Sequence, residues 1–132
     1  MNKSPIHPAG HTKPRGAYSP AVKVELPGGG LMLFVTGQLA RAPDGQVVAP
    51  FDATVQAEYI FQLVGEILAT AGMEFGDIVR IQTYLTDMGD FPKFSAVRDR
   101  YVGGARPAST LLEVKGLAHP GCCVEVEVTA LK

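Results

Sequence analysis

The residues with the clearest capacity for chemistry lie around Pro107, in the stretch GGARPASTLLEV. Proline fixes its own φ and pushes the residue before it towards an extended conformation, so Arg106 stands on stiff backbone. Ser109 and Thr110 follow, and their hydroxyls are able to donate hydrogen bonds to a neutral carbonyl or hydroxyl group. We therefore expect a small-molecule site at this break, with Ser109, Thr110 and Arg106 as candidate substrate-binding residues.

The other reactive residue types give weaker signals. His119 is the only histidine of the expected folded region and lies in a loop, so no Ser-His-Asp arrangement supports a nucleophilic serine. His7 and His11 are separated by Pro8 and Gly10, which argues against a helical metal site and favours a solvated tail. These histidines therefore predict no metal site.

Two adjacent cysteines, Cys122 and Cys123, occur in a strand-like run. Neighbouring side chains of a strand point to opposite faces, so these two are poorly placed to bond to each other. Free thiols suit a reducing compartment, and packing is the simpler role for both.

Length and charge limit the classes of protein. A chain of 132 residues forms one domain that buries roughly two thirds of its unfolded surface. The formal net charge of -1 provides no electrostatic footprint for nucleic acid or an anionic membrane. No apolar run approaches the roughly 20 residues of a spanning helix, and the N-terminus lacks the apolar core of a secretory signal. A cytoplasmic protein with a small-molecule ligand is expected.

Hydrophobic spacing predicts the elements. Residues 1–16 are expected to form an irregular arm and residues 17–132 a single domain. Apolar residues spaced three and four apart predict helices at 54–71, capped by Asp52 or Thr54, and from Asp90 to Gly103. Alternating or β-rich runs predict strands at 18–26, 31–38, 46–49, 78–85, 109–114 and 122–131. The order β-β-β-α-β-α-β-β predicts an α+β fold, a mixed sheet with two helices on one face.

The other face of this sheet is expected to be half polar. Cys122 is assigned to the apolar side. The residues assigned to the other face are Thr36, Gln38, Gln82 and Ser109, then Cys123, Glu125, Glu127, Thr129 and Leu131 of the last strand, together with Met32, Phe34 and Leu111. A surface of this kind usually faces a partner or solvent. We expect an oligomer whose sheets face one another.

Several segments occur in the order typical of one family. They are Ala17-Tyr18-Ser19-Pro20, Phe34-Val35-Thr36-Gly37-Gln38, Asp77-Ile78-Val79, Tyr84-Leu85-Thr86-Asp87-Met88, Arg106-Pro107-Ala108 and Val124-Glu125-Val126-Glu127. From about Tyr18 to Leu131 the chain resembles the Rid (YjgF/YER057c/UK114) family. The resemblance implies a chorismate-mutase-like fold, a homotrimer and a ligand pocket at each subunit interface. RidA-like members hydrolyse reactive enamines and imines to ketones and ammonia without a cofactor.

The resemblance also implies roles for individual residues. Glu127 matches a glutamate near the family's pocket, where it would hold or protonate the attacking water; an ion pair across the trimer is its structural alternative. Tyr18 matches a pocket tyrosine that would orient water, or else be buried at the interface. Thr36 and Gly37 would offer backbone hydrogen bonds to a ligand, or Gly37 would serve only close strand approach.

The chain departs from the RidA pattern at the substrate-binding arginine. RidA has Pro-Ala-Arg-Ser-Cys, whereas Pro107 and Ala108 are followed here by Ser109, Thr110 and Leu111. A serine hydroxyl cannot replace a guanidinium that grips a carboxylate. We therefore expect a divergent branch that hydrolyses a small imine or enamine other than an ordinary 2-imino acid. The alternative is a trimer of the same fold that binds a small molecule or a protein without catalysis. Ribonuclease activity is poorly supported by the net charge and by the lack of a histidine pair.

Overall fold

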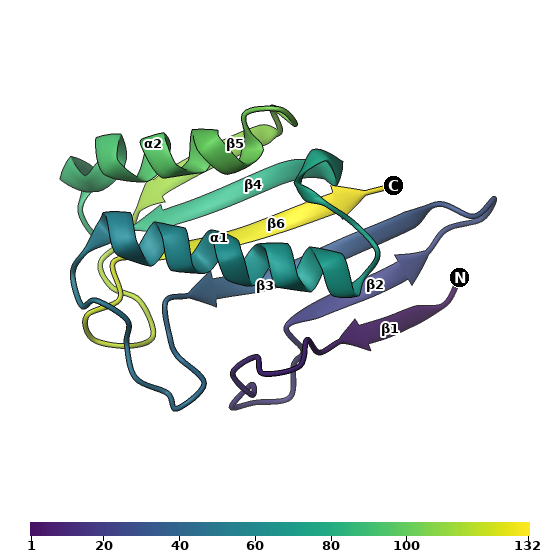
Figure 1. The fold of residues 1–132 in the computed structure, drawn as a ribbon, viewed down its shortest axis with the longest axis horizontal. Coiled ribbons are helices and arrows are strands. Elements are labelled where there is room, and N and C mark those ends of the chain that lie inside the picture. The colour runs from purple at the N-terminus through teal and green to yellow at the C-terminus, as the bar shows by residue number, and fades with distance from the viewer.

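The computed structural model describes residues 1–132 as a mixed six-stranded sheet with two helices packed on one face (Figure 1). The strands are β1 Lys3–Ile6, β2 Ala21–Glu25, β3 Leu31–Leu39, β4 Ile78–Leu85, β5 Ala108–Glu113 and β6 Val124–Leu131. Their order across the sheet is β1-β2-β3-β6-β4-β5, and only the β4–β5 pair is parallel. This is the α+β architecture that the sequence predicts.

The two helices begin and end where their capping residues predict. α1 spans Ala53–Thr70, and its first turn is capped by Asp52, whose side chain accepts a hydrogen bond from the Val55 N–H at 3.0 Å. α2 spans Phe91–Val102 and carries a proline in its first turn. Both bury an apolar face against the sheet, and Phe61 of α1 packs against Phe94 of α2. Two short 3-10 helices, Phe75–Asp77 and Met88–Asp90, lead into β4 and α2.

The N-terminal arm differs from the prediction. Residues 1–16 were expected to be irregular, but Lys3–Ile6 pair with β2 in antiparallel fashion, and Ile6 belongs to the core. The strand predicted at 46–49 is wrong, since only an isolated bridge joins Arg41 and Val47 there. The predicted number of strands is thus correct, but the first strand of the sheet comes from the arm and the strand predicted at 46–49 is missing.

A β-bulge in β3 changes which face its last residues use. Val35 pairs with Val128 of β6, but the next partner pair is Gln38 with Val126, so Thr36 and Gly37 form the irregularity. Gln38 therefore shares the helix-covered face with Val126 and is buried. Its predicted place on the open face is wrong.

Cys123 does not lie on the open face as predicted, and Cys122 is buried as well. β6 begins only at Val124, so strand alternation does not extend back to them. Cys123 lies in the core, and its N–H donates to the Gln56 side chain at 2.9 Å. Burial raises the pKa of Cys123 to about 11, which leaves the thiol protonated at neutral pH. Neither cysteine is in a disulfide.

The face of the sheet opposite the helices carries exposed apolar side chains. Phe34, Leu112 and Leu131 are 47%, 51% and 45% exposed. Arg80, Gln82 and Tyr84 of β4 lie between them, in register with Thr129, Glu127 and Glu125 of β6. The predicted half-polar character of this face is confirmed. Neither helix has the length and apolar character needed to cross a bilayer.

Candidate functional site

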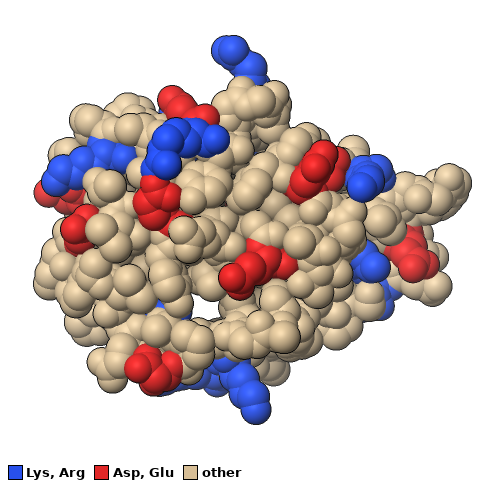
Figure 2. All heavy atoms as spheres, viewed as in Figure 1, with Lys and Arg blue, Asp and Glu red and all other residues tan.

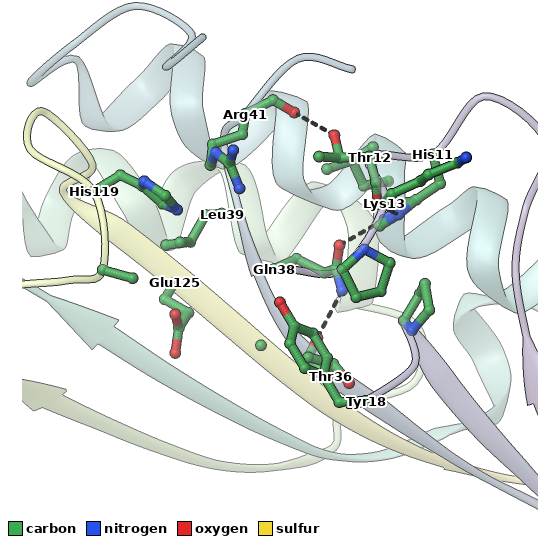
Figure 3. Close-up of a pocket in the computed structure, with 15 residues that line it drawn as sticks. His11, Thr12, Lys13, Tyr18, Thr36, Gln38, Leu39, Arg41, His119 and Glu125 are labelled. Atoms are coloured by element: carbon green, nitrogen blue, oxygen red, sulfur yellow. Dashed lines mark hydrogen bonds between the residues drawn. The ribbon is translucent and has the colours of Figure 1, made fainter. Parts of the chain in front are cut away.

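A cavity of about 300 Å³ opens where the last residues of β3 meet the N-terminal arm (Figure 3). Its wall comes from five parts of the chain: the arm, the segment before β2, β3 and its continuation to Arg41, the loop before β6, and the start of β6. Leu63 of α1 completes it. Most of the residues that line the cavity are polar or charged, while apolar atoms make up about half of its surface, a combination that suits a small molecule with polar groups.

Glu125 supplies the carboxyl group of this cavity. Its side chain lies over the bulge, and a Cβ atom placed at Gly37 would stand 2.8 Å from Glu125 Oε2. Burial raises the pKa of Glu125, and the nearby charge of Glu127 raises it further. A carboxyl whose pKa is raised in this way holds its proton more tightly than a solvated glutamate does, which suits it to give a proton to a bound molecule.

Tyr18 and Thr36 lie in the same cavity, as does Gly37. The Tyr18 side chain is more than half exposed, so its hydroxyl is free to meet a ligand. Thr36 instead uses its hydroxyl to donate to the Ser19 carbonyl at 2.6 Å, which holds the segment before β2 against the bulge. The structure thus brings three sequence-predicted residues together beside Glu125, a site residue that the sequence analysis did not single out.

The opposite end of the cavity is basic. Arg41 and His119 lie there together, and Lys13 joins the lining from the arm (Figure 3). The pKa of His119 is lowered by burial first and by the charges of Arg41 and Arg15 second. Neutral His119 is therefore the dominant form at neutral pH.

His11 is a site residue that sequence reasoning missed. One of its ring nitrogens, Nε2, lies 2.9 Å from Gln38 Oε1, and the other, Nδ1, lies 2.9 Å from the Thr12 carbonyl oxygen. His119 is thus not the only histidine of the folded region. No signal in the sequence pointed to this contact, because strand alternation assigned Gln38 to the open face, and only the bulge buries the amide that His11 meets.

Glu127 lies on the open face of the sheet. Its Oε1 accepts a hydrogen bond of 2.8 Å from the Tyr84 hydroxyl, and this bond raises the pKa of Tyr84. Beside them, Arg80 donates to the Thr110 hydroxyl at 3.1 Å. Glu127 and Thr110 therefore belong to one polar group, which lies outside the lining of the cavity.

Ser109 and Arg106 lie at a third place. Ser109 pairs with Ile81, which puts it on the helix side of β5, so its predicted place on the open face is wrong. Leu111 is on the helix side too and packs against the core. Ser109 and Arg106 line a separate hollow beside α2. Arg106 has a φ of 49°, a strained value for a residue other than glycine, so the extended conformation predicted for it is wrong.

Charged side chains of both signs are distributed over the helix-covered face, and a hollow opens in its lower part with basic atoms at the margin (Figure 2). No group of three histidine, cysteine, aspartate or glutamate side chains is placed to hold a metal ion.

Comparison with known proteins gives the family. Over residues 9–132 the chain matches the family described as Endoribonuclease L-PSP. It is 34% identical to Protein DfrA of Myxococcus xanthus, over 99% of this chain and 97% of that protein. The solved structure of YyfA, a Rid-family protein from Yersinia pestis, is similar with a TM-score of 0.86, 27% identity and 98% coverage of both chains. The chain belongs to the Rid (YjgF/YER057c/UK114) family.

Some Rid relatives have an activity in their names. The chain is 30% identical to the 2-iminobutanoate/2-iminopropanoate deaminase of Mus musculus, over 89% of this chain and 82% of that protein. In this Rid chain the predicted site residues occupy three separate places: Tyr18, Thr36 and Gly37 in the cavity, Glu127 and Thr110 on the open face, and Ser109 and Arg106 beside α2.

Proposed function

We propose that this Rid protein hydrolyses a small reactive imine or enamine to a carbonyl compound and ammonia. In this reaction one water adds across the C=N bond, the C–N bond of the resulting carbinolamine breaks, and the nitrogen leaves as ammonia. An enamine first takes a proton on carbon to become the imine. The similarity to a mammalian iminobutanoate deaminase supports the reaction class.

The observation that carries the proposal is the Glu125 carboxyl over Gly37, with its raised pKa. Hydrolysis of an imine needs a group that protonates nitrogen and a group that accepts a proton from water. Glu125 supplies the proton in our proposal, and the Tyr18 hydroxyl orients the water. Glu127 lies on the same face of β6 but outside this cavity, and in our proposal it accepts the proton from water once assembly brings it to the cavity of another subunit.

We also propose a homotrimer, in which a neighbouring subunit completes the site. The exposed apolar side chains of the open face support self-association. Assembly would allow the Glu127 and Thr110 group, or Ser109 and Arg106, to approach the cavity of another subunit. The two buried thiols favour a reducing compartment such as the cytoplasm.

The substrate we propose is not an ordinary 2-imino acid. Ser109 replaces the arginine that would grip the carboxylate beside the reacting carbon, and a hydroxyl provides no charge. A charge-assisted contact contributes about 1.5–3 kcal/mol, so its loss lowers affinity roughly tenfold to a hundredfold.

Ammonia release from a panel of imines and enamines generated in place tests the proposal: an amino-acid oxidase supplies 2-imino acids, a serine dehydratase supplies 2-aminoacrylate, and an amine oxidase supplies imines without a carboxylate beside the reacting carbon. We expect 2-aminoacrylate and iminoleucine to react at least about tenfold more slowly than the best member of the panel. Glu125→Gln should lower kcat/KM by roughly 10²- to 10⁴-fold. Glu66→Gln, an exposed change on α1, serves as the control. Full activity of the Glu125 variant would refute the assignment of Glu125 as the proton donor. Ammonia release no faster than the uncatalysed rate for every member of the panel would favour the non-catalytic trimer.

RNA cleavage is a second candidate, because His11 and His119 line one cavity. Both ring nitrogens of His11 are already hydrogen bonded, however, which leaves no free acid and base pair. RNA cleavage is therefore less well supported than imine hydrolysis. RNA degradation that His119→Ala abolishes would reverse this order, whereas degradation that survives the change would indicate a contaminant.

A further inference from the structure

A second hollow adjoins the cavity at its basic end. It has a volume of about 460 Å³, and no hydrophobic residue contributes to its wall. The two spaces share His11, Thr12, Lys13 and Arg41, whereas Arg15 borders only the second. A molecule that occupied both would have one end at Glu125 and the other at the arginines.

The guanidinium groups of Arg41 and Arg15 lie close together at Gly45. A Cβ atom placed at Gly45 would stand 3.3 Å from Arg41 Nη2 and 3.7 Å from Arg15 Nη2. Arg41 is held in place because its Nε donates to the Gly45 carbonyl at 3.3 Å. The turn of residues 43–45 thus brings two positive groups to one point.

No carboxylate neutralises these groups. The three ion pairs of the chain use Lys93, Arg98 and Arg100, and none involves Arg41, Arg15 or Lys13. Asp44 is the only acidic residue in the wall of the second hollow, and its Oδ1 accepts from the Gln46 N–H at 2.9 Å. The pKa of His119 is lowered by burial and also by the positive charges of Arg41 and Arg15.

We propose that Arg41 and Arg15 bind an anionic group of the substrate, a carboxylate or a phosphate, that is remote from the carbon reacting at Glu125. Paired guanidiniums match the oxygens of such groups with charge-assisted hydrogen bonds. The reacting end rests on the proposed imine hydrolysis, but the anion site does not depend on it. The substrate class is then an imine or enamine with a second, acidic end.

This placement fits the loss of the family arginine at Ser109. A substrate carboxylate beside the reacting carbon would meet no guanidinium at position 109. An acid group at the far end of the substrate would meet two, those of Arg41 and Arg15. The chain therefore selects its substrate by the distance between the C=N carbon and the acid.

Binding is tested without turnover, by following the ring protons of His119 by NMR through a pH titration. Inorganic phosphate or acetate is added at constant ionic strength. We expect saturation with the preferred anion to raise the pKa of His119, because it offsets the positive charge of both guanidiniums. The anion with the lower dissociation constant identifies the acid group. His7, which is exposed, serves as the internal reference.

Variants make this test specific. Arg41→Gln or Arg15→Gln should weaken anion binding by roughly tenfold to a hundredfold. Arg100→Gln, on α2, should bind as the wild type does. Two variants are used because Arg41 also holds its turn, whereas Arg15 is exposed and its loss leaves the fold intact. An unchanged His119 titration with both anions, or equal weakening by Arg100→Gln, would overturn the proposal.

A kinetic comparison links the anion site to the reaction. We expect 2-iminoglutarate, which has a distal carboxylate, to be hydrolysed with a kcat/KM about tenfold or more above that of 2-iminobutanoate, and Arg41→Gln to remove this preference. Turnover of imines without an anion effect on His119 would leave the deaminase and refute the anion site. An effect of anions on the His119 titration without turnover of any imine would support the anion site and refute the proposed deaminase activity.

Discussion

At the scale of single residues, the carboxyl of Glu125 is distinguished by its surroundings rather than by its sequence context. The strand alternation of β6 places both Glu125 and Glu127 on one face, and the family resemblance drew attention to Glu127. Only the fold shows that Glu125 lies over the bulge and inside the cavity, while Glu127 is hydrogen bonded to Tyr84. A sequence does not reveal this, because burial depends on segments far apart in the chain.

Glu125→Gln should change how stability depends on pH. The pKa of this carboxyl is raised above its usual 4.5, so the folded chain binds the proton more tightly than the unfolded chain does. The free energy of unfolding therefore falls as pH rises from the usual range through the raised pKa. The Tm of the variant minus that of the wild type should grow between pH 3 and pH 8, measured by circular dichroism. A difference that stays constant with pH would show that Glu125 is not perturbed by folding.

Gly37→Ala should displace the carboxyl of Glu125 without unfolding the chain. The new methyl would stand 2.8 Å from Oε2, which is the flexible end of a side chain and able to move away. We expect a stability cost of about 1 kcal/mol or less and a fall in kcat/KM of roughly tenfold to a hundredfold. Gly116→Ala, where a methyl meets open space, is the matched control. Equal kinetics of the two variants would mean that the position of Glu125 does not matter.

At the scale of elements, the sequence predicts what depends on local periodicity. α1, α2, β4 and the hairpin of β2 and β3 follow from apolar spacing and turn residues, as does the cap at Asp52. Three features were mispredicted, two because unbroken strand alternation was assumed and one because the arm was taken to be a solvated tail. The bulge at Thr36 and Gly37 moved Gln38 to the other face, β6 began after the cysteines, and the arm gained a strand by pairing with β2.

Gln56 connects the elements that surround the cavity, and its replacement should be costly. From the first turns of α1, its amide nitrogen donates to the carbonyls of Val48, Ala49 and Gly121, at 3.2, 3.1 and 2.8 Å. Its oxygen accepts from the Cys123 N–H. Gln56→Leu keeps the volume but leaves buried groups unpaired, so the free energy of unfolding should fall by about 2–4 kcal/mol.

Urea unfolding measures this loss, and Gln62→Leu, at an exposed position of the same helix, is the control. A loss below about 0.5 kcal/mol, as is usual for a surface change, would show that the loops do not depend on the amide.

At the scale of the whole molecule, the open face of the sheet decides how the separate groups of site residues combine. Within one chain the cavity, the pair of Glu127 and Tyr84, and the hollow at Ser109 are distinct. Apolar side chains border the polar middle of the sheet, an arrangement that favours contact between copies. The active unit that we propose is accordingly the trimer.

Phe34→Asp should therefore disrupt both assembly and activity. Phe34 is 47% exposed on the open face, where a charge would have to be buried if another sheet covered it. We expect the variant to sediment as a monomer and to lose most of its imine hydrolysis, while its circular dichroism spectrum is unchanged. Phe51→Asp is the control, because Phe51 is 76% exposed on the loop before α1, away from the sheet. A wild-type chain that sediments as a monomer, or a fully active Phe34 variant, would mean that one chain holds a complete site and that the cavity at Glu125 works alone.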